Sequence, residues 1–117
     1  MIFVIDSDVE MAECVALACE ESGREVRIFH DALAAMRALS DGLPELIFLD
    51  IMLTGPDGFS FLNEMISYAD TARVPVVVVS GVDFGGANLE VYGVVGVLNK
   101  DTMKPEDIKK YVAEYTR

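Results

Sequence analysis

Acidic, hydroxyl and ammonium side chains stand where the apolar runs of this sequence end. Asp50 ends the run Leu-Ile-Phe-Leu, and Asp6 and Asp8 follow the run Ile-Phe-Val-Ile. Ser80 follows four consecutive valines, and Lys100 closely follows a Val-Leu pair. Because parallel strands place their ligands at their carboxyl ends, we expect all five side chains to meet at one edge of one sheet.

Three neighbouring carboxylates raise each other's pKa unless a cation neutralises them. Mg²⁺ suits such a place, because it takes one or two carboxylates, several waters and often a phosphate oxygen. Lys100 adds a positive charge for a phosphoryl oxygen, and Ser80 adds a hydroxyl donor. Asp50 would be the nucleophile that accepts a phosphoryl group as an acyl phosphate.

Each of these residues also has a purely structural explanation. Asp6 or Asp8 would serve as a helix cap, and Ser80 would serve as a turn residue. A lone Lys100 is most simply a solvated lysine. Asp50 is the hardest to explain this way, because no helix follows it directly. The convergence on several strand ends, rather than any single residue, favours a phosphoryl-binding site.

Apolar runs and amphipathic stretches alternate along the chain, which predicts an α/β fold with a doubly wound, five-stranded parallel sheet and helices on both faces. Short apolar runs bounded by turn residues predict strands that are buried on both faces. Strands are predicted at 2–5, 26–29, 46–50, 76–79 and 97–98, and helices at 7–23, 31–41, 57–66, 87–92 and 105–115.

Three helices carry specific expectations. Ser7 and Glu10 have the spacing of a capping box at the start of the first helix. Phe59, Leu62 and Ile66 are predicted to form the buried face of the third helix. Ile108, Tyr111, Val112 and Tyr115 would form the buried stripe of the last one.

The fourth helix is predicted to be weak. Glycines at 81, 85, 86 and 93 leave only about six residues for it. A helix of that length is marginal in isolation. We therefore expect it to be short, frayed or mobile.

Composition places the chain among ordinary globular domains. Its 117 residues are 52% hydrophobic and 25% charged, which fits a single domain over residues 1–117. The formal net charge of −11 argues against nucleic acid or an anionic membrane as a direct partner.

Cys14 and Cys19 lie five residues apart in one predicted helix, so they point apart and do not pair. With no apolar run near transmembrane length, we expect a cytoplasmic protein.

The sequence resembles the receiver domains of two-component response regulators over essentially its whole length. The residues that carry the resemblance are Phe-Val-Ile-Asp-Ser-Asp at 3–8, Leu-Asp-Ile-Met-Leu at 49–53 with Asp-Gly at 57–58, Pro75 to Gly81, and 93–100. The resemblance implies the flavodoxin-like strand order 2-1-3-4-5.

The same resemblance implies a role for each site residue. Asp50 resembles the phosphoacceptor, Lys100 the lysine that binds the phosphoryl group, and Ser80 the switch hydroxyl. Asp6 resembles the first metal-site acid and the Met52 carbonyl the main-chain metal ligand, so Mg²⁺ would be held by Asp6, Asp50 and Met52. Such a domain takes phosphoryl from a histidine kinase or a histidine phosphotransfer protein. It is not an enzyme beyond self-phosphorylation from phosphodonors and auto-dephosphorylation.

Several positions depart from the pattern of the family. Ser7 stands where the second metal-site acid is usual, and Val97 where the switch aromatic is usual. Thr54 and Asp101 replace two prolines. These departures support a second hypothesis, a pseudo-receiver that keeps the fold and acts as a phosphorylation-independent interaction module.

A third hypothesis is a phosphatase of the haloacid-dehalogenase type. The sequence Asp-Ser-Asp-Val at 6–9 looks like the nucleophile motif of that family. Against it, no further acidic motif follows Lys100 at a strand end, and Asp50 would have no role. Turnover of a generic phosphomonoester would be its distinguishing property.

The output of a receiver would lie on an apolar switch face. Phe84, Tyr92, Val97 and Tyr111 are expected to carry an effector contact or self-association there. The cognate kinase and any attached effector domain are not encoded in recognisable motifs.

Overall fold

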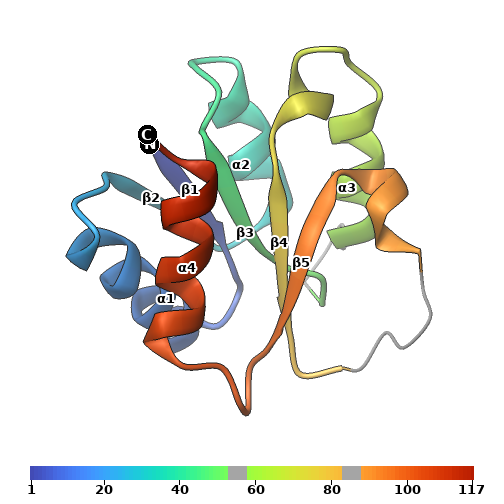
Figure 1. Ribbon diagram of the computed structural model, residues 1–117. Coiled ribbons are helices and arrows are strands. Elements are labelled where there is room, and N and C mark those ends of the chain that lie inside the picture. The colour runs from blue at the N-terminus through green and yellow to red at the C-terminus, as the bar shows by residue number, and fades with distance from the viewer. Residues whose placement is uncertain (53–57, 83–87) are drawn as a thin grey trace.

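The computed structural model describes residues 1–52, 58–82 and 88–117, and the predictions made for Phe84 and Thr54 fall outside them. Five strands form one parallel sheet in the order β2-β1-β3-β4-β5, which confirms the expected topology (Figure 1). The strands are β1 (Ile2–Ile5), β2 (Val26–Phe29), β3 (Leu46–Asp50), β4 (Val76–Ser80) and β5 (Val94–Asn99). The helices are α1 (Val9–Glu21), α2 (Ala32–Leu39), α3 (Gly58–Ile66) and α4 (Pro105–Tyr115), with 3₁₀ turns η1 (Thr71–Arg73) and η2 (Leu89–Tyr92).

Helices cover both faces of this sheet. One hydrophobic cluster joins α1 and α4 to the sheet, and a second joins α2, α3 and η2 to the opposite face (Figure 1). Every residue of β1, β3 and β4 is buried, as the continuous apolar runs predict for strands covered on both sides. The middle of the sheet is therefore a rigid platform for the residues at its carboxyl edge.

The start of α1 corrects the expected capping box. Asp8, not Ser7, is the N-cap, and its carboxylate accepts a hydrogen bond of 3.2 Å from the Met11 amide. Both residues are good cap formers, so the sequence alone did not separate them. The cap of α2 is as expected, because the Asp31 carboxylate accepts from the Ala34 amide at 2.8 Å.

The buried face of α3 agrees only in part with the predicted one. Leu62 is buried as predicted and Phe59 packs partly buried against the core, but Phe61 and Met65 complete the buried face and Ile66 is 38% exposed. Gly58 fixes this rotation, because the first turn of the helix packs its backbone against Ile51. Both stripes are apolar in sequence, so periodicity gave the helix but not its orientation.

The fourth helix is reduced to η2, a single 3₁₀ turn, which confirms that it is short. Leu89 is the one buried residue of this turn, and the turn ends at Gly93 with φ of 80°. In the last helix Ile108 and Val112 are buried, whereas Tyr111 and Tyr115 are only partly covered, so half of the predicted stripe is fully buried. Within the described ranges, no helix is both long and apolar enough to cross a membrane.

Candidate functional site

The predicted site residues stand at the carboxyl edge of the sheet. Asp50 and Ser80 are the last residues of β3 and β4, and Asp6 and Lys100 directly follow β1 and β5. The register places Asp50 beside Val79, and the amide of Lys100 donates to the Ser80 carbonyl at 3.0 Å. Four strands that are separate in sequence therefore bring their ends together.

The same local turn holds the end residue of four strands. In each, the side-chain oxygen accepts a hydrogen bond from the amide two residues later, which is the geometry of Asx and Ser/Thr turns. The pairs are Asp6 with Asp8 (2.8 Å), Asp50 with Met52 (3.0 Å), Ser80 with Val82 (3.1 Å) and Asn99 with Asp101 (2.8 Å). These side chains are therefore oriented by their own backbone.

Lys100 joins the two carboxylates. Its Nζ lies 3.1 Å from Asp6 Oδ2 and 3.2 Å from Asp50 Oδ2. Asp6, Asp50 and Ser80 are 3%, 5% and 1% exposed, so the acids and the hydroxyl lie at the bottom of the site. A buried pair of carboxylates bridged by one ammonium leaves one negative charge that the described site residues do not balance.

Burial and pairing act on the pKa of the two charged partners. Burial raises the pKa of Asp6, although hydrogen bonds from the Asp8 amide and Lys100 oppose this. Burial lowers the pKa of Lys100, but the hydrogen bond to Asp6 and the charges of Asp6 and Asp50 outweigh it, so that pKa is raised. Lys100 is therefore held firmly as a cation beside Asp50.

Asp8 does not add a third carboxylate to this cluster, because it caps α1. Among the described residues, no group of three or more His, Cys, Asp or Glu side chains is placed to hold a metal ion. Met52 contributes its amide to Asp50, and its side chain is 63% exposed. Metal binding by the Met52 carbonyl stays a prediction.

His30 is a neighbour of the site that the sequence analysis missed. Its Nδ1 lies 2.9 Å from the carbonyl oxygen of Asp6. Because a carbonyl only accepts, Nδ1 is the donor. His30 follows β2 directly, so the rule that picked out the other strand ends also marks this position.

The comparisons with known proteins agree with this geometry. The sequence profile described as the response regulator receiver domain matches residues 2–113. The chain belongs to the receiver domain family of response regulators. The receiver domain of NtrX from Brucella abortus is 29% identical and superposes with a TM-score of 0.81, covering 98% of this chain and 97% of that one.

Curated relatives of this receiver are regulatory proteins of greater length. The nitrogen assimilation regulatory protein NtrX of Azorhizobium caulinodans is 35% identical over 82 residues, which is 68% of this chain and 18% of that protein. The regulator RpaA of Synechocystis is 26% identical over 112 residues, which is 96% of this chain and 46% of that protein. The receiver thus spans less than half of either relative.

Proposed function

We propose that this receiver accepts a phosphoryl group on Asp50 from a phosphohistidine of a histidine kinase or a histidine phosphotransfer protein. The observation that supports the proposal most directly is the contact of Lys100 Nζ with both Asp50 and Asp6 in a buried cluster. A carboxylate held at a strand end beside a fixed ammonium is suited to attack phosphorus and to have the resulting charge balanced.

In the proposed transfer, one bond to phosphorus forms as another breaks. One carboxylate oxygen of Asp50 forms a bond to phosphorus, the phosphorus–nitrogen bond of the phosphohistidine breaks, and its electron pair returns to the imidazole nitrogen. Lys100 contacts the phosphoryl oxygens through its ammonium. The Ser80 hydroxyl oxygen accepts from the Val82 amide. Because a hydroxyl also donates, its proton would reach a phosphoryl oxygen, and the described residues provide no competing acceptor.

The donor set fits Mg²⁺, although with fewer carboxylates than the three acids first expected. Asp6 and Asp50 supply two buried carboxylates, which is within the one or two that Mg²⁺ uses when it also binds phosphate. When bound, the ion would neutralise charge on the transferred phosphoryl group. Among the neighbours, the receiver domain of the sensor kinase PA1611 from Pseudomonas aeruginosa is described with magnesium in its active-site cleft.

A pseudo-receiver is the second candidate function, and two observations favour it. Ser7 replaces an acid next to Asp6, and Val97 is 47% exposed where the family carries its switch aromatic. Of the proposed output residues in the described ranges, Tyr92 and Tyr111 are partly covered, so Val97 is the most accessible of them. For either candidate function we also propose a cytoplasmic location, and an effector contact or self-association through this face.

The deciding experiment is the intact mass after incubation with acetyl phosphate and Mg²⁺. The wild type is expected to gain one phosphoryl group, and Asp50→Asn is expected to gain none. Ser80→Ala is the matched control at the neighbouring strand end, because it keeps the nucleophile and should still form an adduct. No adduct on the wild type at saturating Mg²⁺ would contradict phosphorylation and favour the pseudo-receiver.

The chemistry of this domain is proposed to stop at its own acyl phosphate. Met52 and Val82 flank the site and are 63% and 47% exposed, and neither offers a polar group to orient an attacking water. We expect slow loss of the adduct and no turnover of a generic phosphomonoester. Multiple turnover of such a substrate would instead support the phosphatase alternative.

A further inference from the structure

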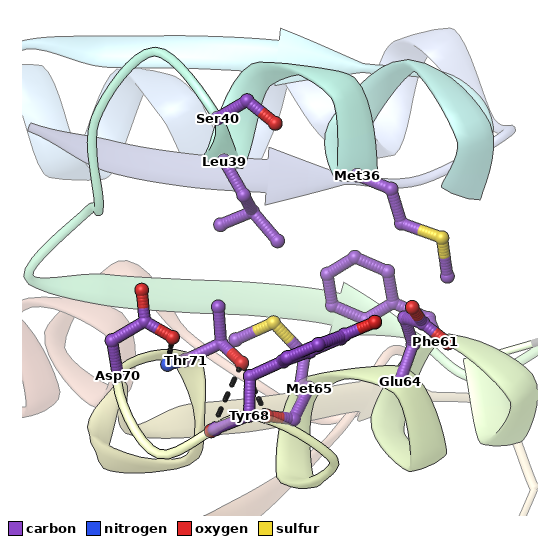
Figure 2. Close-up of a pocket in the computed structure, with 9 residues that line it drawn as sticks. All are labelled: Met36, Leu39, Ser40, Phe61, Glu64, Met65, Tyr68, Asp70 and Thr71. Carbon is purple, nitrogen blue, oxygen red and sulfur yellow. Dashed lines mark hydrogen bonds between the residues drawn. The ribbon is translucent and has the colours of Figure 1, made fainter.

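A cavity of about 350 Å³ lies between α2 and the segment formed by α3 and η1. Figure 2 shows Met36 and Leu39 extending from α2 toward side chains of the other wall. Its lining continues past the end of α3 to Thr71, shortly before β4 begins, so it opens near the amino edge of the sheet. No residue of the phosphoryl site lines it.

The walls of this cavity are aromatic and thioether surfaces. Phe61 and Met65 are buried at 0% and 2% exposure and form the inner wall. Tyr68 is 59% exposed as a residue, and its ring lies across the gap from Leu39 and Met36 (Figure 2). Such surfaces bind flat apolar groups by stacking and by sulfur–aromatic contact. The volume is at the lower end of the range of about 300–1,000 Å³ that is typical of small-molecule pockets.

The polar part of the lining is negative. Glu64 and Asp70 contribute carboxylates, and none of the nine described lining residues is Lys or Arg. One oxygen of Asp70 accepts from the Thr71 amide at 2.8 Å. In the part of the chain that the structure describes, Glu64 has no ion-pair partner within 4.0 Å. The Thr71 hydroxyl donates to the carbonyls of Met65 and Tyr68, so it is not free to donate to a ligand.

We propose that this cavity binds a small aromatic amine in its protonated form. The aromatic ring would lie against Tyr68, Leu39 and the inner wall, and the ammonium would face Glu64, while Asp70 adds a second negative charge at the other end of the cavity (Figure 2). A neutral or anionic ligand of the same shape would leave both carboxylates without a counter-charge, and the formal net charge of −11 would further disfavour an anion.

The test is an amide NMR titration of the whole receiver with 2-phenylethylamine, which is protonated at neutral pH. The expected result is saturable shifts of the amides of Ser40, Tyr68 and Thr71, with a Kd of roughly millimolar for a ligand of this size. The neutral analogue 2-phenylethanol should bind several-fold more weakly. Equal affinity for the two compounds, or shifts that centre away from the cavity, would overturn the proposal.

Variants test the two parts of the site separately. Glu64→Gln should weaken amine binding by about two-fold to five-fold, as expected for an exposed charge pair. Asp70→Asn, at the other end of the cavity, should weaken it less, and both variants should leave phenylethanol binding unchanged. Tyr68→Ala should weaken both compounds. Glu13→Gln, an exposed acid on α1, is the matched control and should change neither. Because no residue of the cavity belongs to the phosphoryl site, a failure here would leave the proposed phosphorylation of Asp50 intact.

Discussion

The two connections that leave the carboxyl edge after β3 and after β4 are built differently. After β3, Ile51 is buried, its carbonyl accepts from the Gly58 amide at 2.9 Å, and the nine-residue helix α3 buries Phe61, Leu62 and Met65. After β4, Gly81 and Val82 are exposed, and the four-residue turn η2 buries Leu89 alone among its residues. Asp50, the proposed phosphoacceptor, is therefore followed by a packed helix, whereas the described residues after Ser80 form a single 3₁₀ turn with one buried side chain.

The same contrast separates the two faces of β5. On the face toward α4, the ring of Tyr111 lies so close to Gly96 that a Cβ there would overlap it. On the other face, Val95 and Val97 are 37% and 47% exposed. Among the described residues, β5 is therefore closely packed by α4 on one face and carries two exposed valines on the other.

The largest expected effect comes from a pair of buried leucines, one in each connection. Leu62→Ala should destabilise the domain by about 2–5 kcal/mol, because it leaves a cavity in the core. The loss of stability for Leu89→Ala should be at or below the lower end of that range, because a single turn at the sheet edge relaxes more easily around the cavity. The measurement is the free energy of unfolding in urea. Equal losses would show that η2 is as firmly packed as α3.

Two glycines, Gly58 after β3 and Gly81 after β4, test how closely the backbone of each connection is packed. In Gly58→Ala the new Cβ would lie 2.5 Å from Ile51 Cα and 2.9 Å from its carbonyl oxygen, so the chain has to move. We expect a loss of about 1–3 kcal/mol, as for overpacked sites. Gly81→Ala is the matched control, because a Cβ there meets no described atom within 4 Å. Thermal unfolding of both variants is the check, and a neutral Gly58→Ala would contradict the close packing.

Much of the site was predictable because strand ends are visible in sequence. Each apolar run fixed where a strand stops, and the parallel topology then brought Asp50, Ser80 and Lys100 together. The choice between Ser7 and Asp8 as cap was not predictable, because both side chains cap well.

Neither the rotation of α3 nor the cavity could be predicted from the sequence, for another reason. The α3 face depends on the contact of Gly58 with Ile51, and both candidate stripes are apolar. The cavity depends on how far α2 stands from Tyr68, which is a distance between segments that are remote in sequence. Spacing rules act within an element and do not specify such distances.

The two faces of β5 provide a smaller test. Gly96→Ala should lower the free energy of unfolding by about 1 kcal/mol, the low end for overpacked sites. The new Cβ would displace the Tyr111 ring, which can rotate away but then loses its packing against the strand. Val97→Thr, on the open face, should change stability by less than about 0.5 kcal/mol, as is usual for exposed positions. Urea unfolding of both variants measures the difference. If adding Tyr111→Phe to Gly96→Ala restored the stability, the clash would be located at the hydroxyl end of the ring.

The smallest expected effect is a difference in pH dependence between Asp6, which follows β1, and Ser80, which ends β4. Because burial raises the pKa of Asp6, the folded state holds this proton to higher pH than the unfolded chain. The contribution of Asp6 to the free energy of unfolding should therefore fall as pH rises from the ordinary aspartate pKa, about 3.9, through the raised one. Between these two values the folded state binds more protons than the unfolded chain.

Asp6→Asn should remove that decline, so its stability relative to the wild type should increase from acidic to neutral pH. Ser80→Ala, which changes no titrating group, should run parallel to the wild type. Urea unfolding in the presence of EDTA, so that no Mg²⁺ interferes, provides the measurement. At alkaline pH the raised pKa of Lys100 acts in the same sense, because its stabilising charge is lost as pH rises through that value. A parallel curve for Asp6→Asn would mean that Lys100 and the Asp8 amide fully offset the burial of Asp6, and that the first acid of this site is as pH-neutral as the hydroxyl of β4.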